Sequence, residues 1–411
     1  AKEQHDKDHK ATTTLSLAKL SSFSHRTRTV HCKGCTNACL LTINSFDSDR
    51  KLISGNKCDR IVRPDSFVSN PELLNLYAFK QQYLAGLASE RNKRGRIGLP
   101  LQLSYYEQLP FWHACLSSLG FEVVVSEPST RQTYLRGQST ISSDTICYPA
   151  KLMHGHIQQL IDAGVETVFY PCSSYNLKEE KGDNHFNCPV VAYYPEVLRH
   201  NMPALLEQKV LFISDYLSLA DERFLPVRLH EILSKHFILD KKEVRLACKL
   251  GYEALKNYQK AVRAQSLIII NEARKRRWPI MVLAGRPYHV DGEVNHGIDS
   301  LLLQCNCAVL SEDGISHLVP KQKRTVLNQW TYHARMYDAA RYVTTQADMH
   351  IIQLVSFGCG LDAVTSDEIR DILRQTKKIY TQIKIDEIAN LGAVKIRIRS
   401  LLAAIGETGC Q

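Results

Sequence analysis

Residues 279–297, Pro279-Ile-Met-Val-Leu-Ala-Gly-Arg-Pro-Tyr-His-Val-Asp-Gly-Glu-Val-Asn-His-Gly297, run from an apolar stretch into a polar loop. The apolar part ends at Ala284 and has the length of a buried strand. The loop leads into Gly297–Gln304, which predicts a helix. A strand, a polar loop and a helix in this order are typical of one unit of a parallel α/β sheet.

The same alternation continues on both sides of this stretch. Toward the C-terminus the sequence predicts strands at Cys307–Leu310 and His350–Val355, and helices at Arg324–Tyr342 and Asp367–Lys377. An earlier unit has predicted strands at Arg96–Pro100, Phe121–Val125, Glu166–Tyr170 and Pro189–Tyr193, with helices at Tyr105–Leu119 and Ala150–Ala163. Strands that alternate with helices indicate right-handed crossovers, so two parallel-sheet α/β domains are expected. Neither carries a Gly-x-Gly-x-x-Gly or Walker A loop, so nucleotide binding is not predicted.

The chain divides into five expected parts. The first residues are too polar to pack, and the missing initiator Met suggests processing or a piece of a longer polypeptide. The parts are a disordered tail at 1–28, a Cys-rich metal-binding segment at 29–90, a first α/β domain at 91–202, a helical connection at 203–277 and a second α/β domain at 278–411.

Three cysteines are expected where strands of the α/β units end: Cys147, Cys172 and Cys359. Ligands of open α/β sheets bind beyond the carboxyl ends of the strands, and iron–sulfur clusters are held by cysteine thiolates. We therefore predict one cluster bound by these three thiols, with Cys188 as a possible fourth ligand or a supporting residue. Buried core thiols are the alternative. Three protein ligands would leave one metal of a cubane open for water or substrate.

A second set of cysteines lies near the N-terminus. Cys32, Cys35 and Cys39 are closely spaced, and Cys58 completes a group of four. Four thiolates at such spacing suit either a tetrahedral Zn²⁺ or a [4Fe–4S] cluster, and the spacing leaves both open. Between them, Leu40–Ile43 and Lys51–Ser54 alternate around a polar turn, which predicts a hairpin.

The polar loop 285–297 carries a dense set of titratable groups for its length. Arg286 could hold a carboxylate or phosphate, while His289 or His296 could move protons, and Asp291 lies between them. The alternative is a polar turn in which Arg286 caps a buried carboxylate and the histidines are satisfied turn residues.

Composition limits the classes of function. The 411 residues include 13 cysteines and carry a formal net charge of +10. No apolar stretch approaches a membrane span and no secretory signal is visible, so a cytoplasmic protein is expected. No nucleic-acid-binding signature accompanies the positive charge, which an anionic substrate or an acidic protein partner would also explain.

Several motifs together resemble a known family. They are Cys-x-Gly-Cys-x-Asn-x-Cys at 32–39, Ile-Ser-Gly-Asn-Lys-Cys at 53–58, Gly-Arg-Pro-Tyr-His at 285–289, Gln-Trp-Thr-Tyr-His at 329–333 and Ser-Phe-Gly-Cys-Gly-Leu-Asp-Ala-Val at 356–364. From Thr29 to Ile405 the chain resembles the activase-related proteins of the 2-hydroxyacyl-CoA dehydratase and double-cubane-cluster superfamily of anaerobes.

The resemblance implies flavodoxin-like domains around a [4Fe–4S] cluster or a larger fused one, and it favours [4Fe–4S] over zinc at Cys32, Cys35, Cys39 and Cys58. It also implies low-potential reduction or radical dehydration of a small anionic or CoA-linked substrate by a homodimer. Electrons would come from an ATP-hydrolysing activase of the actin/Hsp70-type fold. This chain has no phosphate loop of that fold, so the activase is expected in trans or on a parent polypeptide.

Three functions stay open from the sequence. The first is an iron–sulfur reductase or dehydratase-like lyase. The second is a non-catalytic electron-transfer or cluster-carrying partner of such a system. The third is a zinc-stapled binding protein whose strand-end thiols are merely buried, and it would be colourless.

Overall fold

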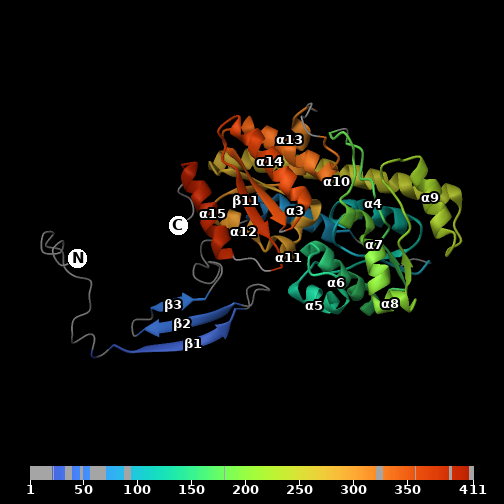
Figure 1. Cartoon of the computed structure of the whole chain (residues 1–411), viewed down its shortest axis with the longest axis horizontal. Helices are drawn as coiled ribbons and strands as arrows, with labels where there is room; N and C mark the ends of the chain where they lie inside the picture. The colour runs from blue at the N-terminus through green and yellow to red at the C-terminus, as the bar shows by residue number, and fades with distance from the viewer. Residues whose placement is uncertain are drawn as a thin grey trace. The chain divides into compact units, whose positions relative to one another are not determined.

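The chain forms two compact units, residues 1–66 and 67–411, in a computed structural model (Figure 1). The residues that the structure describes are 21, 23–32, 39–46, 50–55, 71–87, 94–179, 181–320, 327–356, 358–387 and 391–406. Among the described helices, none is both long and apolar enough to cross a membrane.

The first unit contains a three-stranded antiparallel sheet in the order β1-β2-β3. Its strands are β1 (His25–His31), β2 (Leu40–Phe46) and β3 (Lys51–Ser54). The pairing of Thr42 with Ser54 and of Ser45 with Lys51 confirms the predicted hairpin. Strand β1 was not predicted, and it begins inside the stretch 1–28 that was expected to be a tail.

The second unit contains two four-stranded parallel sheets, which confirms the predicted fold class. The first sheet has the order β5-β4-β6-β7, with β4 (Arg96–Leu99), β5 (Glu122–Val125), β6 (Thr167–Phe169) and β7 (Leu211–Ile213). The helices along this part are α4 (Tyr105–Ser118), α5 (Arg131–Gly137), α6 (Tyr148–Asp162), α7 (Pro189–Asn201) and α8 (Pro203–Leu206).

The second sheet has the order β11-β10-β8-β9. Its strands are β8 (Ile280–Ala284), β9 (Ala308–Leu310), β10 (Met349–Ser356) and β11 (Thr381–Ile385). The helices along this part are α11 (Gly292–Asn295), α12 (Ile298–Gln304), α13 (Thr331–Thr344), α14 (Gly360–Arg374) and α15 (Leu391–Ala404), with short 3-10 turns at η4 (Pro287–Val290), η5 (Glu312–Gly314) and η6 (Ser316–Leu318).

Both sheets have the same topology. Numbered by chain order within each sheet, the strands lie in the spatial order 2-1-3-4, as in flavodoxin-like folds. The chain reverses its direction across the sheet between β4 and β6, and again between β8 and β10. Ligands of such sheets bind outside the carboxyl ends of the strands at these points, so the fold offers one such place in each sheet.

The predicted strand Pro189–Tyr193 is wrong, because these residues begin helix α7. Cys188 is the N-cap and Pro189 occupies the first turn, where its fixed φ favours a helix start. The buried residues Val191, Tyr194 and Leu198 recur at helical spacing. The fourth strand of this sheet is β7 instead, which lies within the expected helical connection.

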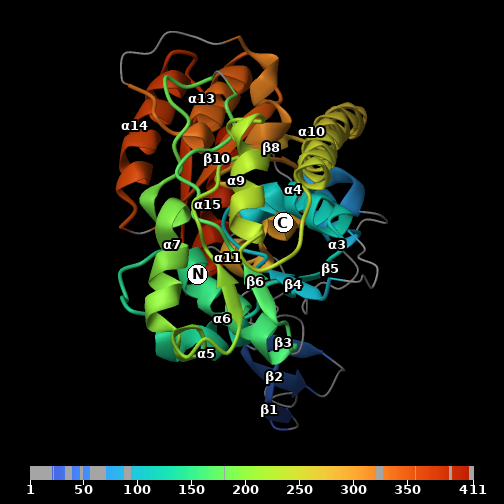
Figure 2. The same ribbon diagram turned by 90° about the vertical axis from the view of Figure 1, so that its right-hand side faces the viewer.

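One long helix packs against elements beside both sheets of the second unit. Helix α10 (Lys241–Arg276) packs against α4 and α9 (Phe224–Leu233) near the first sheet, and against α3 (Leu76–Ala85), β9 and η5 near the second. Figure 2 shows α10 beside α4. Asp240 caps its first turn by accepting from the backbone N–H of Lys242 at 2.7 Å. One continuous buried core runs through both sheets and these helices.

A glycine contact holds α6 close to α5. A Cβ on Gly155 would lie 1.8 Å from the carbonyl oxygen of Thr133, because the two helices approach at this point. We expect Gly155→Ala to lower the free energy of unfolding by about 1–3 kcal/mol, since the backbone of α5 would have to move. Urea denaturation measures this. Gly292→Ala is the matched control, because a Cβ there meets nothing within 4 Å, and an equal loss in both variants would contradict the packing argument.

Candidate functional site

Three thiols lie at the N-termini of helices that follow strands of the two parallel sheets. Cys147 is the N-cap of α6, Cys188 of α7 and Cys359 of α14. A crossover helix runs back across its sheet and so begins at the carboxyl edge of the strands. Cys147 was expected directly at a strand end, but a turn and two short helical elements separate it from β5. All three cysteines therefore lie at the positive ends of helix dipoles, which favour a thiolate or an anionic ligand.

The three thiols are electrostatic neighbours of one another and of Arg286. The pKa of Cys147 is raised to about 12, chiefly by burial and also by Cys188 and Cys359, while the backbone N–H of Ala150 and Arg286 act to lower it. Burial also raises the pKa of Cys188, which has Arg286 and Cys359 as neighbours. We call Cys147, Cys188 and Cys359 the three-thiol site. It joins residues from both sheets of the second unit.

Cys172 has different neighbours. It is fully buried, and its backbone N–H donates to the carbonyl oxygen of Ser214 at 3.3 Å. Burial raises its pKa to about 12, and the charged groups that act on it are Glu196, Arg199 and Asp215. Tyr170 has both Cys172 and Cys188 among its electrostatic neighbours. The structure thus groups Cys147 and Cys359 with Cys188, while Cys172 faces another set of residues.

Arg286 is the buried cation of this region. It follows β8, while Cys359 follows the adjacent parallel strand β10, so the two flank the point where the second sheet reverses its direction. Its Nη2 atom donates to Asp362 Oδ1 at 2.5 Å and to Cys359 Sγ at 3.2 Å. Asp362 also accepts from the backbone N–H of Ser356 at 2.9 Å. Arg286 therefore caps a buried carboxylate, and the same nitrogen contacts a thiol of the site.

His289 is buried beside Arg286 and is neutral. Burial, and next the charge of Arg286, lower its pKa well below the ordinary value. Its Nδ1 atom accepts from the backbone N–H of Arg286 at 3.2 Å, so a neutral ring carries its proton on Nε2. That Nε2 atom has no hydrogen-bond partner among the described residues. The ring also requires Gly285, because a Cβ there would lie 2.1 Å from Nδ1.

Two further histidines lie in this part of the molecule. His296 is partly buried, its Nε2 atom is 2.5 Å from the carbonyl oxygen of Asp386, and its ring stacks on Tyr148. His333, on α13, is buried, and neither ring nitrogen has a partner among the described residues. Burial and Arg286 lower the pKa of His333 well below the ordinary value. His333 was quoted within a motif but was not predicted as a site residue.

Tyr288 and Asp362 were also missed as site residues. Tyr288 is buried, and burial raises the pKa of its hydroxyl, with Arg286 lowering it and the three thiols raising it further. Tyr288 therefore lies among all members of the three-thiol site. Both residues stand inside motifs quoted from the sequence, Gly-Arg-Pro-Tyr-His and Cys-Gly-Leu-Asp, so the signal was present.

Asp291 connects the loop 285–297 by hydrogen bonds to residues that follow β4 and β5 of the first sheet. Its Oδ2 atom accepts from Tyr106 at 2.7 Å, from Gln102 at 3.2 Å and from Ser129. Ser129 in turn contacts His156 Nε2 at 2.8 Å. Every member of this network is buried and partnered. Asp291 therefore acts as an anchor that sets where the loop meets the first sheet.

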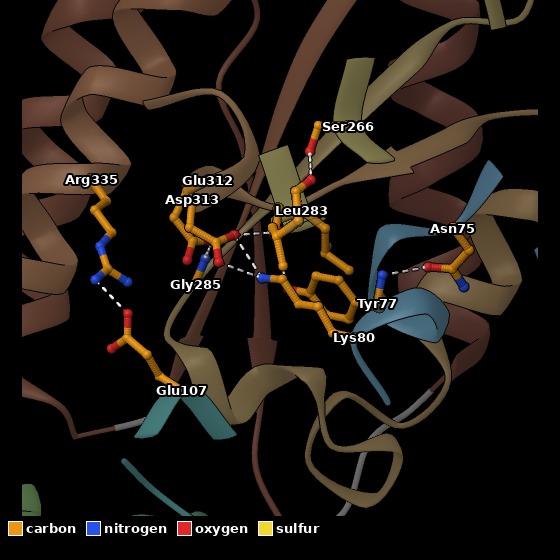
Figure 3. Close-up of polar contacts among 12 residues, drawn as sticks. Asn75, Tyr77, Lys80, Glu107, Ser266, Leu283, Gly285, Glu312, Asp313 and Arg335 are labelled. Carbon is orange, nitrogen blue, oxygen red and sulfur yellow. Dashed lines mark hydrogen bonds and ion pairs between the residues drawn. The ribbon is translucent and has the colours of Figure 1, made fainter. Parts of the chain in front are cut away.

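A buried carboxylate fixes the start of the same loop (Figure 3). The backbone N–H of Gly285 donates to Glu312 Oε2 at 3.2 Å. Next to it, Lys80 donates to both carboxylate oxygens of Asp313, at 2.6 and 2.7 Å. Burial, and next the negative charge of Asp313, raise the pKa of Glu312 to about 7. Glu312 therefore exchanges a proton near neutral pH beside the loop that carries Arg286.

This raised pKa predicts a pH dependence of stability. The unfolded chain releases the Glu312 proton near its ordinary pKa of 4.5, whereas the folded chain keeps it until about pH 7. Between these values the folded state binds more protons, so Glu312 makes the free energy of unfolding fall as the pH rises, by up to about 1.4 kcal/mol per pH unit. Urea denaturation at about pH 5, 6 and 7 should show this slope reduced in Glu312→Gln. The exposed Glu222→Gln is the control and should keep the wild-type slope.

The N-terminal cysteines are described only in part. Cys32 and Cys39 are buried, and the backbone N–H of Cys32 donates to the carbonyl oxygen of Cys39 at 2.8 Å. Cys35 and Cys58 lie outside the described residues. Within the described ranges, no three His, Cys, Asp or Glu side chains are grouped closely enough to hold a single metal ion. The predicted metal at these four cysteines stays a prediction.

Comparison with known proteins gives one family match. A family model described as "CoA enzyme activase uncharacterised domain" matches residues 96–315, slightly more than half of the chain. The match includes Cys147, Cys188 and Arg286, and it ends before Cys359.

The alignment with one solved structure is extensive but weak. It is the crystal structure of the N-terminal part of the protein BF1531 from Bacteroides fragilis, which contains a phosphatase domain complexed with Mg. It is 12% identical, covers 80% of this chain and 97% of that chain, and has a TM-score of 0.16, too low to carry an argument. No curated protein matches the chain.

Proposed function

Because this chain belongs to the family of CoA enzyme activase-related proteins, we propose that it is an iron–sulfur protein that receives electrons from an ATP-dependent activase. In this proposal it performs low-potential reduction or radical dehydration, as in the 2-hydroxyacyl-CoA dehydratase and double-cubane-cluster superfamily. It works in the cytoplasm, with the activase in trans or on a parent polypeptide. The observation that carries the proposal is the convergence of Cys147, Cys188 and Cys359 around Arg286.

We propose that this donor set holds a cluster and is not merely a buried thiol core. Burial holds the thiols of Cys147 and Cys188 protonated, because it raises both pKa values. A coordinated thiol is deprotonated by the metal, and the helix N-termini and Arg286 compensate the resulting negative charge. Within the described residues no three His, Cys, Asp or Glu side chains are grouped closely enough for a single metal ion, whereas a cubane would present a different iron to each ligand. We propose that these residues hold a [4Fe–4S] cluster, or one cubane of a larger fused cluster.

The proposed ligands are Cys147, Cys188 and Cys359, with Cys172 as the sequence-based alternative to Cys188. When bound, a cluster of this kind would supply electrons at low potential. Arg286 would hold the Cys359 thiolate and Asp362 in place at the same time. Its position favours charge compensation at the cluster over the binding of a substrate carboxylate.

The histidines are proposed to act on the substrate side. His289 presents a buried Nε2–H with no partner among the described residues, so it can donate to a substrate oxygen or a water molecule. His333, whose ring nitrogens are equally unpartnered there, is a second candidate. His296 is held by Asp386 and is a weaker candidate, because its Nε2 atom is occupied. The substrate is proposed to be a small anionic or CoA-linked molecule, turned over by a homodimer.

Cys32, Cys35, Cys39 and Cys58 are proposed to bind a second metal, as [4Fe–4S] in preference to zinc. Because metal binding at such sites is coupled to folding, Cys35→Ser should unfold the N-terminal segment and leave the signal of the three-thiol site intact.

Turnover separates an enzyme from an electron carrier. Anaerobically purified protein would be mixed with a purified activase, ATP and 2-hydroxyacyl-CoA substrates, and the products would be followed by mass spectrometry. Loss of turnover in His289→Ala with an unchanged cluster spectrum supports a catalytic role for this residue. A reducible cluster with no turnover of any substrate favours the electron-transfer alternative.

A further inference from the structure

Strand β1 forms one edge of the N-terminal sheet (Figure 1). All seven residues of this strand, His25–His31, are exposed. We call its outer side, which points away from β2, the β1 edge. A long exposed edge strand presents a row of backbone N–H and C=O groups that can pair with a further strand.

The register of the sheet shows which backbone groups lie on the β1 edge. The backbone N–H of Cys32 donates to the carbonyl oxygen of Cys39 at 2.8 Å, and the same register continues along β1. In an antiparallel pair, residues bonded to the neighbouring strand alternate with residues whose groups point the other way. The backbone groups of His25, Thr27 and Thr29 therefore point outward. Within the described ranges, these outward groups have no hydrogen-bond partner.

The side chains beside this edge are basic. Arg26 and Arg28 are two residues apart, so they lie on the same face of the sheet. Neither forms an ion pair with another described residue, and β1 contains no Asp or Glu. A second copy of β1 would add only positive charge beside these arginines. An acidic strand would instead form cross-strand ion pairs with them, which stabilise strand pairing.

An aromatic cluster lies at one end of the β1 edge. The ring centroids of Phe23 and His25 are 6.2 Å apart, and that of Phe46 lies 5.8 Å from Phe23 and 6.2 Å from His25. Phe23 is 46% exposed. The cluster therefore offers an aromatic contact to the end of an added strand.

We propose that the β1 edge binds an extended segment of a partner protein that carries acidic side chains at alternate positions. The segment adds a fourth strand to the sheet, and its backbone bonds to the outward groups of His25, Thr27 and Thr29. Its acidic side chains lie beside Arg26 and Arg28, because alternate side chains of a strand share one face. This surface belongs to the first unit and does not depend on the three-thiol site.

Fluorescence anisotropy of labelled peptides, titrated with the full chain at low salt, tests the proposal. The probe is Trp-Glu-Thr-Glu-Thr-Glu-Trp. We expect saturable binding of the probe and about tenfold lower affinity for Trp-Lys-Thr-Lys-Thr-Lys-Trp, in which attraction becomes repulsion. The isomer Trp-Thr-Glu-Glu-Glu-Thr-Trp has the same composition without the alternation, and its affinity should be about threefold lower.

Methylation of the peptide backbone locates the contact while the protein stays unchanged. One methylated probe carries methyl groups on its three glutamate amides, and the other carries them on the two threonine amides and the last tryptophan amide. Only every second N–H of an added strand faces β1, so one set should abolish binding and the other should keep the affinity within about threefold. Equal effects of the two sets would overturn the addition of a strand.

Variants of β1 test the same contact from the side of the protein. Thr27→Pro removes an outward N–H but no bond to β2, a change that edge strands tolerate, and it should weaken binding by at least about tenfold. Thr27→Val keeps this N–H and should bind as wild type. Arg28→Glu should weaken binding by about tenfold. Lys51→Glu makes the same change of charge on β3, at the other edge, and should stay within about threefold.

Three results would overturn the proposal. The first is the absence of saturable binding of the acidic probe. The second is wild-type affinity in both Thr27→Pro and Arg28→Glu. The third is tighter binding of a single-stranded oligonucleotide of the same net charge than of the probe, which would assign the β1 edge to nucleic acid.

Discussion

Cys188→Ser is expected to lower the affinity of the second unit for its cluster by at least about tenfold. Even residues that only support a metal ligand change metal affinity by about 10–100-fold, and a direct ligand should matter at least as much. The thiol of Cys188 is grouped with Cys147, Cys359 and Arg286 by its electrostatic neighbours. Iron content and visible absorption of the anaerobically purified variant measure the loss.

Two cysteine variants serve as controls. Cys172→Ser should retain iron, because Cys172 faces Glu196, Arg199 and Asp215 instead of Arg286. Cys248→Ser, in the interior of α10, should also retain it, since this thiol is buried against Cys115. Iron loss in Cys172→Ser together with wild-type iron in Cys188→Ser would restore the ligand set Cys147, Cys172 and Cys359 and refute ours.

Arg286→Ala is expected to lower the free energy of unfolding by about 3–5 kcal/mol. The side chains of Arg286 and Asp362 are both 4% exposed, so removal of the guanidinium leaves a buried carboxylate without its cation. Urea denaturation of protein without its cluster gives the number directly. The double variant Arg286→Ala/Asp362→Asn should recover part of the loss, because the uncompensated charge is then gone.

A surface ion pair provides the comparison for this effect. Arg274 and Asp348 form a pair at 2.8 Å whose side chains are 44% and 35% exposed, and Arg274→Ala should cost about 0.2–1 kcal/mol. Equal losses in Arg274→Ala and Arg286→Ala would mean that Arg286 is not a buried, paired cation.

The sequence predicted the strands that are apolar throughout and the loops that follow them. Ile280–Ala284 and Met349–Ser356 are buried along nearly their whole length, as strands covered on both faces must be, and their composition shows it. The position of Arg286 and Cys359 at one edge of the second sheet followed from this, because adjacent parallel strands end on the same side.

The grouping of the thiols could not be predicted in the same way. Val190, Val191 and their neighbours have strand propensity, and the capping of α7 by Cys188 became visible only with the packing of that helix. Because the sequence predicts a strand after Cys188, it indicates this residue only as a possible fourth ligand or a supporting residue. His333 is one of 16 histidines, and its closeness to Arg286 depends on the crossing of two elements 47 residues apart in sequence (333 − 286). Such contacts depend on tertiary structure, which local patterns do not specify.

The central claim is that the three-thiol site holds an iron–sulfur cluster, and electron paramagnetic resonance combined with iron and sulfide analysis tests it most directly. Wild-type protein and Cys35→Ser would be purified without oxygen and reduced with dithionite. We predict bound iron and acid-labile sulfide and a paramagnetic signal on reduction in both proteins, with the signal lost when Cys147→Ser or Cys359→Ser is added to Cys35→Ser. Colourless protein that contains zinc but neither iron nor sulfide would contradict the claim.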